Sequence, residues 1–365
     1  MGSGVITLKK ALIFSAVFDF LGAIVFGRFV SATLMKGIVD VTYLPAEAII
    51  KGMIAALFAT GLWVLLASIL KIPMSISQAI VGGVIGFGLV TGGAGIVNWV
   101  TVSAIFTSWF VLPIFSAALA ATLYFMYRSM FRRLELINII ASSSTFLMVF
   151  STVFLLMVKT LKLEDLVWVL LVSTLSGSLA ALATHLYWVR LPGTLEERAS
   201  SVMRLLIIVA AAAMAFSHGA NDVANSAGPL SAIYVAYTEG YVPAKVRIDP
   251  LILSFCAAGI AIGIVSWGQR VVDTIGQEIT LLNPQRAFVS QLAGSLSVLV
   301  LTRLGMPVST TMSIVGAVAG VGLARGLKAV NVRTLAKIFG AWALAVPAVM
   351  GMTAGLYYVF TALPL

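Results

Sequence analysis

Four side chains that could bind ions, His218, Asn221, Asp222 and Asn225, stand together in the stretch FSHGANDVANSAGPLSAI, residues 216–233. They directly follow the apolar run RLLIIVAAAAMA, where a charged group is costly. An acid in such a place normally faces a cavity, pairs with another group or marks an ion pathway. Asp222 and its neighbouring carboxamides supply the hard oxygen ligands that suit a small cation. The stretch therefore predicts a cation site; the alternative is a helix cap and turn at the membrane surface.

Two further stretches place hydroxyl groups directly after a proline, at Pro73 and at Pro307. The hydroxyl residues are Ser75, Ser77, Ser309, Thr310 and Thr311. Because proline favours the first position of a helix, each cluster is expected at a helix N-terminus. Free N–H groups and partial positive charge make such an end an anion site, and phosphate suits it well. The alternative is that the hydroxyls only cap helices and that the glycines after them only allow close packing.

A carboxylate by itself repels an anion, so the acidic stretch and the hydroxyl clusters need a third component to form one site. A bound Na⁺ or H⁺ would neutralise Asp222, and the cation and the anion would then load together. This arrangement predicts symport. His218 is expected to hydrogen-bond a nearby backbone carbonyl; the alternative is a proton relay.

Apolar helices must position these residues, and the composition of the chain indicates that such helices are present. Of the 365 residues, 61% are hydrophobic and 10% are charged, which is far outside the range of soluble domains. The excess of 23 basic over 13 acidic residues is typical of Lys and Arg in cytoplasmic loops, so we do not expect nucleic-acid binding. A single cysteine, Cys256, excludes an intrachain disulfide and a cysteine-built metal site. The composition predicts an all-α polytopic protein of the cell membrane, embedded in the lipid bilayer.

Eight apolar runs are long enough to cross a bilayer, which takes roughly 20 residues. They cover residues 11–34, 48–70, 99–126, 141–158, 166–189, 250–272, 286–302 and 334–360. Three other stretches, 73–90, 205–236 and 306–324, are apolar but interrupted by Gly, Pro and hydroxyl residues. Interrupted segments of this kind indicate the binding site of a secondary transporter.

Two of the interrupted stretches repeat one another. PMSISQAIVGGVIGFGL from Pro73 and PVSTTMSIVGAVAGVGL from Pro307 agree at 9 of 17 positions without a gap. The match continues downstream, where Trp109 aligns with Trp342. We therefore predict a first transmembrane repeat, a connecting region of spans and polar loops, and a second transmembrane repeat. Their bounds are 1–130, 131–203 and 204–365.

The GANDVANSAGPLSAI stretch and the two Pro-x-Ser/Thr segments resemble the inorganic phosphate transporter (PiT) family, which couples phosphate uptake to Na⁺ or H⁺. The resemblance covers nearly the whole chain. It implies two repeats of inverted topology, each with discontinuous helices and a re-entrant hairpin, and a site near the midplane. It implies phosphate binding by Ser75, Ser77, Ser309, Thr310, Thr311, Asn225 and Gln291. It implies cation binding by Asn221, Asp222, Ser226 and Asp19, with Asp222 and Asn221 as ligands of a metal cation.

Two points qualify the resemblance. Asp19 sits where the family has an acidic residue, but it could instead pair with Arg28. Family members also carry a first GANDVAN-like motif that runs into a VGSGV-like sequence, whereas this chain begins MGSGV. We hypothesise that Met1 stands at a valine whose GTG codon was taken as the start, or that the chain was shortened there. The DNA upstream tests this, because an in-frame stop would exclude the first explanation.

We expect a secondary transporter that imports inorganic phosphate with a cation, Na⁺ ahead of H⁺. The site should open to each side in turn, with hinges at Gly92, Gly93 and Gly95. The alternatives are proton-coupled uptake, another oxyanion such as sulfate or molybdate, and an anion-selective channel. We expect no enzymatic activity, because no nucleophile or metal set accompanies the acids, and no cofactor beyond the coupling ion. The resemblance also implies a homodimer.

Overall fold

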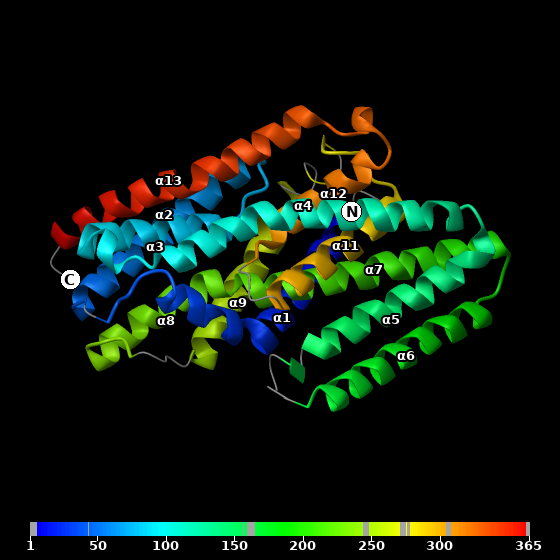
Figure 1. Ribbon diagram of the computed structural model, residues 1–365, viewed down its shortest axis with the longest axis horizontal. Coiled ribbons are helices and arrows are strands. Elements are labelled where there is room, and N and C mark those ends of the chain that lie inside the picture. Colours follow the sequence, from blue (N-terminus) through cyan, green and yellow to red (C-terminus); the bar gives the residue numbers. More distant parts are fainter. Residues whose placement is uncertain are drawn as a thin grey trace.

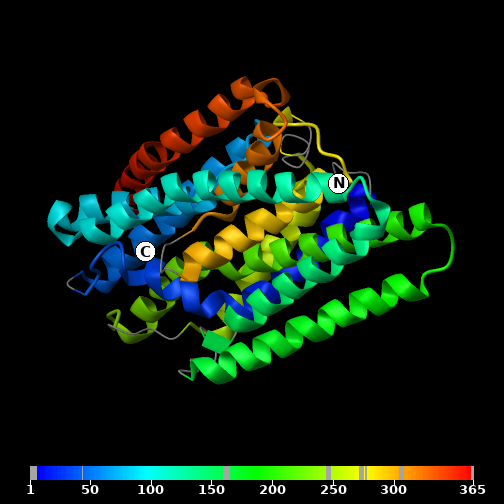
Figure 2. The same ribbon diagram turned by 45° about the vertical axis from the view of Figure 1, so that its right-hand side comes forward.

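The computed structural model describes residues 6–42, 44–155, 157–158, 165–243, 248–270, 275, 278–303 and 308–362, without the side chains of 28–36, 155, 299, 302 and 303. The regular elements of these residues are helices. The α-helices are α1 (Leu8–Lys36), α2 (Ala46–Ile69), α3 (Ile76–Gly92), α4 (Trp99–Met130), α5 (Ile137–Leu155), α6 (Leu166–Arg190), α7 (Leu195–Asp222), α8 (Ala224–Glu239), α9 (Pro250–Trp267), α11 (Pro284–Arg303), α12 (Thr310–Leu323) and α13 (Val332–Ala362). Short 3₁₀ helices are η1 (Ala94–Ile96), η2 (Leu134–Leu136) and η5 (Leu327–Ala329). The helices form one bundle, with α13 and the α5–α6 pair on opposite sides (Figures 1 and 2).

Within the described residues, 8 helical segments are long and apolar enough to cross a membrane. All but one of them correspond to predicted spans. The exception is Leu195–Glu239, formed by α7 and α8, which contains the interrupted stretch 205–236. The predicted span 286–302 lies in α11, which is not among these segments. The Asn, Gly and Pro residues of the stretch 205–236 leave only a one-residue break between α7 and α8, at Val223, because neighbouring helices supply partners for its polar groups.

Two helical hairpins enter the bundle from opposite ends. In the first, α2 and α3 run antiparallel, with Gly52 beside Phe87 and Gly83 beside Ala56. The second consists of α11 and α12, and Ser313 on α12 donates to the Gly294 carbonyl on α11. Because α12 runs parallel to α4, which begins just after α3 ends, the free ends of the two hairpins point in opposite directions. The described parts of their tips, residues 70–75 and residues 308–309, meet inside the bundle, where the hydroxyls of Ser75 and Ser309 are in contact.

Each hairpin packs against a long helix from the other end of the chain. A Cβ on Gly82 of α3 would lie 2.6 Å from the Val346 carbonyl oxygen of α13, and a Cβ on Gly86 would lie 2.4 Å from that of Met350. On the other side, a Cβ on Gly316 of α12 would lie 2.4 Å from the Pro113 carbonyl oxygen of α4. Gly320 of α12 is equally close to the backbone of Ala117 on α4. Glycine is required here because only its absent side chain lets two helix backbones approach so closely.

Substituting Gly316 with Ala is expected to lower the melting temperature of the detergent-solubilised protein by about 5 °C, because the new methyl group overpacks the α4 contact. Gly351→Ala on α13 is the matched control, since no atom of the described residues lies within 4 Å of the Cβ it would add. Alanine should leave the control unchanged or slightly more stable. Thermal unfolding followed by circular dichroism measures both, and equal melting temperatures would contradict the packing argument.

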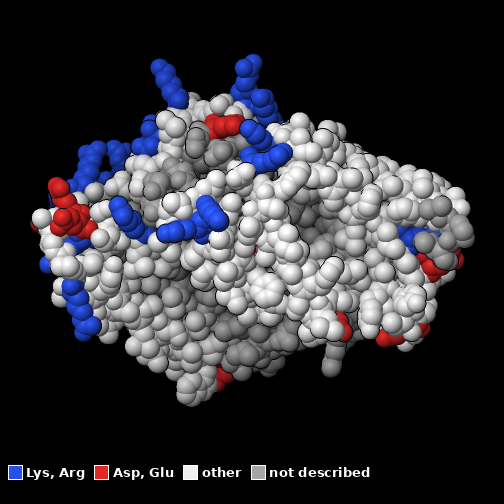
Figure 3. Space-filling model, turned by 180° about the vertical axis from the view of Figure 1, so that it is seen from behind, with Lys and Arg blue, Asp and Glu red and all other residues white. Residues whose placement is uncertain are grey.

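One end of the bundle is rich in basic residues. The end of α4, the start of α5 and the starts of α7 and α11 meet there around a cavity of about 410 Å³. Arg128, Arg132 and Arg133 follow along the end of α4, and Arg198 and Arg204 lie on the first turns of α7. Lys and Arg gather at one end and along the upper edge of the face in Figure 3, and its broad lower part is almost free of them. Such an asymmetry is typical of a membrane protein with a cytoplasmic, basic side.

The periphery of the bundle is apolar, as contact with lipid requires. Leu171, Leu175 and Leu179 follow one another at every fourth residue of α6, and all three side chains are more than half exposed. Phe110 and Ile114 form a similar pair on α4. In water such large apolar patches would be unfavourable, so these faces are placed against the bilayer.

Candidate functional site

The acidic stretch lies where two helices meet in the middle of the bundle. α7 ends at Asp222 and α8 begins at Ala224, so Asn221, Asp222 and Asn225 flank the break at Val223. Pro229 follows Asn225 by four residues and lacks the N–H that the Asn225 carbonyl would otherwise accept. All three polar side chains are buried. The alternative of a helix cap and turn at the membrane surface is therefore wrong.

The hydroxyl clusters lie at the N-termini of α3 and α12, as predicted. Ser75 caps α3 by accepting from the Gln78 backbone N–H, and Ser309 caps α12 by accepting from that of Met312. Pro73 does not occupy the first helical position, which was the expectation for it. It lies two residues before the cap, because the Ser75 side chain fixes the start of the helix. Pro307 lies outside the described residues.

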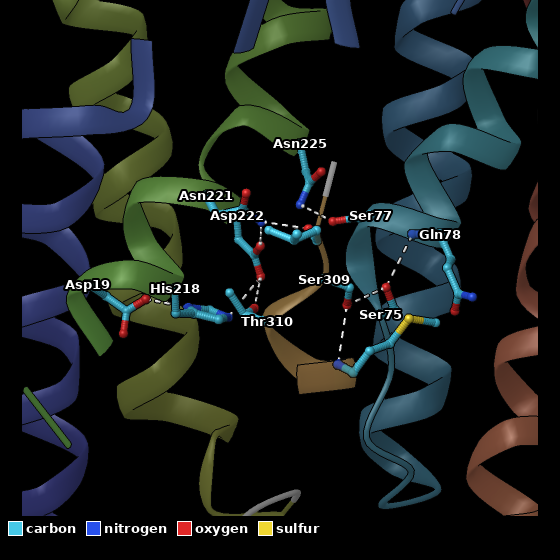
Figure 4. A network of polar contacts seen from close by, with 12 residues as sticks. Asp19, Ser75, Ser77, Gln78, His218, Asn221, Asp222, Asn225, Ser309 and Thr310 are labelled. Atoms are coloured by element: carbon cyan, nitrogen blue, oxygen red, sulfur yellow. Dashed lines mark hydrogen bonds and ion pairs between the residues drawn. The ribbon is translucent and has the colours of Figure 1, made fainter. Parts of the chain in front are cut away.

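Asp222 contacts both the α12 tip and its own helix. Its Oδ2 accepts from the Thr310 hydroxyl at 3.1 Å and lies 2.9 Å from Nε2 of His218. Its Oδ1 accepts from Nδ2 of Asn221 at 2.9 Å. The same Asn221 nitrogen donates to the Val308 carbonyl at 3.0 Å, just before the α12 cap. The carboxylate and the second hairpin tip are thus joined directly (Figure 4).

His218 bridges two carboxylates, and the expectation of a backbone carbonyl partner is wrong. Its Nε2 faces Asp222, and its Nδ1 contacts Oδ1 of Asp19 on α1. The position of His218, four residues before Asp222, places both side chains on one face of α7. The Asp19 contact depends on the packing of α1 against α7, so no local sequence signal could have revealed it. Arg28, the other partner considered for Asp19, has a side chain outside the described residues.

The bridge forms because α1 and α7 touch through glycine. A Cβ on Gly219 would lie 1.8 Å from the backbone oxygen of Asp19, and a Cβ on Gly22 would lie 2.0 Å from that of Phe216. Only two glycines permit this distance between the helix axes. The close approach brings Asp19, which is 3% exposed, within reach of the His218 ring. The contact joins an acid from the start of the chain to the acidic stretch 200 residues later.

The two hairpin tips also touch each other. The Ser75 hydroxyl donates to the Ser309 hydroxyl at 2.8 Å, so the cap residues of two helix N-termini are in direct contact. Beside them, Nδ2 of Asn225 donates to the Ser77 hydroxyl at 3.3 Å. Figure 4 shows the tips on one side of the break between α7 and α8, with Asn225 and Asp222 pointing at them. Partial positive charge from two helices therefore converges beside the carboxamides.

The remaining predicted residues reach the site through a cavity of about 1250 Å³. Ser226, Gln291 and Thr311 line it together with Asp19, His218 and Thr310, and its other walls are mostly apolar residues of α1, α2 and α9. Among the described residues, Oε1 of Gln291 is buried without a hydrogen-bond partner. Ser290, 1% exposed, lines the same cavity, and its hydroxyl also has no partner in the described part of the chain. Ser290 was not singled out from the sequence, because a serine beside a glutamine in an apolar helix carries no signal.

Comparisons with known proteins agree on one family. Residues 1–353 match the phosphate transporter family. A protein of Pyrococcus horikoshii that carries the provisional name phosphate permease is 35% identical over 368 residues, covering 98% of this chain and 90% of its own length. A protein of Chlamydia muridarum with the same provisional name is 34% identical; the match covers 95% of this chain and 89% of that protein. The solved structure of a sodium-dependent phosphate transporter superposes with a TM-score of 0.92 at 34% identity, covering 100% of this chain and 92% of that one.

Proposed function

This chain belongs to the phosphate transporter family, a family of multi-pass membrane transporters rather than enzymes, and we propose that it imports inorganic phosphate together with Na⁺. The observation that carries the proposal is the contact of two hairpin tips, each a helix N-terminus, beside a buried carboxylate. An anion and a cation can then occupy adjoining places and neutralise one another.

Phosphate is assigned to the tips. The caps Ser75 and Ser309 lie 2.8 Å apart at their hydroxyls, so a phosphate that enters between them would take their hydroxyls and the free N–H groups behind them as donors. Ser77, Thr310 and Asn225 lie beside these caps (Figure 4), and Thr311 and Gln291 line the adjoining cavity together with Thr310. Because the donors come from opposite ends of the chain, phosphate would hold the two hairpins together.

The cation is assigned to Asp222 with Asn221, Ser226 and Asp19 nearby. Among the described residues, no group of three or more His, Cys, Asp or Glu side chains could hold a metal ion, which disfavours a transition metal. A single carboxylate with amide and hydroxyl oxygens suits Na⁺ better. The structural neighbour is a sodium-dependent phosphate transporter, which supports the same ion.

Two further features support alternating access and inward transport. The matched contacts of α3 with α13 and of α12 with α4 support a duplicated arrangement, in which one hairpin leads to each side of the membrane. Gly93, at the end of α3, has a φ of 71°, a value that favours glycine and suits a hinge. The basic end of the bundle would face the cytoplasm.

The test is uptake of ³²P-phosphate into proteoliposomes under an imposed Na⁺ gradient, an imposed pH gradient, or neither. We expect accumulation driven by Na⁺ that saturates with phosphate and resists competition by sulfate and molybdate. Uptake driven only by the pH gradient would support proton coupling, to which the His218 bridge between two carboxylates would contribute. Gradient-independent flux without saturation would support a channel, and both results would contradict the proposal.

Thr310→Val tests the link between Asp222 and the α12 tip. The substitution keeps the shape of the side chain and removes the hydroxyl that donates to the carboxylate. We expect the Na⁺ concentration for half-maximal uptake to rise about tenfold, because the hydroxyl no longer orients the Asp222 carboxylate as a cation ligand. Thr353→Val is the control, since the Thr353 hydroxyl is buried with no partner among the residues that the structure describes. If both variants keep the wild-type Na⁺ dependence, the link has no role.

A further inference from the structure

The tip of the α2–α3 hairpin is held from outside by one tryptophan. After α2, the Ile72 N–H donates to the Ala67 carbonyl, and the chain then runs through Pro73 to the cap at Ser75. The buried carbonyl of Pro73 accepts a hydrogen bond of 2.9 Å from Nε1 of Trp342, on α13. Trp342 is 2% exposed. This bond joins the backbone two residues before the proposed phosphate ligand Ser75 to a helix at the far end of the chain.

Trp342 belongs to the face of α13 that packs along α3. Trp342, Val346 and Met350 recur at every fourth residue of α13, so they share one face. Val346 and Met350 lie against Gly82 and Gly86 of α3, as described above. Trp342 extends the same contact past the helix start and reaches the turn. Its ring is fixed by Phe339, whose ring lies edge-on with centroids 5.0 Å apart.

The same pattern of residue types occurs on α4. Trp109, Pro113 and Ala117 recur at every fourth residue, and the last two lie against Gly316 and Gly320 of α12. Phe106 packs on Trp109, with ring centroids 4.8 Å apart, as Phe339 packs on Trp342. Each of the two long helices thus has a tryptophan one turn before its glycine contacts, at the end nearest the hairpin tip. For Trp342, the described residues include its partner, Pro73.

We propose that Trp342 is a positioning residue for phosphate, which sets the place of Ser75 by holding the Pro73 carbonyl. The proposal rests on the assignment of phosphate to the tips. Without the indole N–H, the Pro73 carbonyl would remain buried with no donor, which costs more than the bond itself contributes. The turn would move to find another donor, and the cap at Ser75 would move with it. Affinity for phosphate would fall, while the helices that carry the hairpin stay packed.

Two substitutions at position 342 separate the hydrogen bond from the packing. Trp342→Phe removes the N–H and part of the ring; benzothienylalanine, introduced at the same position, keeps the two-ring shape and removes only the donor. Trp63→Phe is the matched control, because Nε1 of Trp63 is buried and has no partner in the part of the chain that the structure describes. In phosphate uptake by proteoliposomes, we expect KM for phosphate to rise about fivefold to tenfold in both 342 variants. The maximal rate should stay within about twofold of wild type, and Trp63→Phe should match wild type in both constants.

A second readout does not depend on transport. Hydrogen–deuterium exchange of the peptide covering residues 70–80 should be faster in both 342 variants than in Trp63→Phe, with exchange in α13 unchanged. If wild type fails to take up phosphate, the proposed function fails, and this exchange measurement still decides whether Trp342 holds the tip. A wild-type KM in both 342 variants, or a loss of maximal rate alone, would overturn the proposal and leave Trp342 a packing residue.

Discussion

Asp222→Asn is expected to reduce Na⁺-driven phosphate uptake on the order of 100-fold, close to the level of empty liposomes. The substitution keeps the shape of the side chain and removes the charge that His218, Thr310 and the proposed cation share. Removing one partner of a buried charged network costs about 3 kcal/mol or more, which corresponds to such a factor. Uptake of ³²P-phosphate by matched amounts of reconstituted protein measures the loss.

Asp165→Asn is the control for this prediction. Asp165 is exposed and caps α6 by accepting from the backbone N–H groups of Val167 and Trp168. Asparagine caps a helix about as well as aspartate, so uptake should be unchanged. If Asp222→Asn retains more than about a tenth of the wild-type rate while folding normally, the buried carboxylate is not the centre of the coupling site.

Gly219→Ala is expected to abolish uptake, although Gly219 is not assigned as a ligand of phosphate or of the cation. The added methyl group would lie 1.8 Å from the Asp19 backbone oxygen, so α1 and α7 must separate. Overpacking of this kind costs about 1–3 kcal/mol, and backbone atoms cannot move aside as a flexible side chain can. The separation would break the contact of His218 with Asp19. We expect uptake below about a tenth of wild type and a lower melting temperature.

The control for this substitution is Gly340→Ala on α13, where the described part of the structure has no atom within 4 Å of the added methyl group. It should keep both uptake and melting temperature. A second variant, Gly219→Ser, should behave like Gly219→Ala, because the clash arises at Cβ, which both side chains have. If Gly219→Ala transports normally, the close contact between α1 and α7 does not position Asp19.

The sequence predicted the helical class, most spans and the residues at the hairpin starts, because these depend on local composition. Apolar runs of about 20 residues indicate spans directly, and Ser75 and Ser309 cap helices wherever the hairpins lie. The break between α7 and α8 was less clear. Asn, Gly and Pro in an apolar run indicate an interruption, yet the two helices together are long and apolar enough to cross a membrane. Other helices satisfy the polar groups at the break, which sequence alone does not show.

The bridging role of His218 and the anchoring role of Trp342 could not be predicted, since both depend on contacts between residues far apart in the chain. His218 meets Asp19 across 199 residues, and Trp342 meets Pro73 across 269. A histidine four residues before an aspartate indicates a shared helix face, but the second carboxylate becomes its partner only when two glycines let α1 approach.

The most direct test of the central claim, one joint site for phosphate and Na⁺, is the affinity of the purified protein for phosphate in sodium and in choline chloride. Isothermal titration calorimetry at equal ionic strength gives both values. If the cation neutralises Asp222 beside the hairpin tips, phosphate should bind at least about tenfold more tightly in sodium, and phosphate should raise the affinity for Na⁺ by the same factor. Asp222→Asn should remove the difference. Equal phosphate affinity in sodium and in choline would contradict the account.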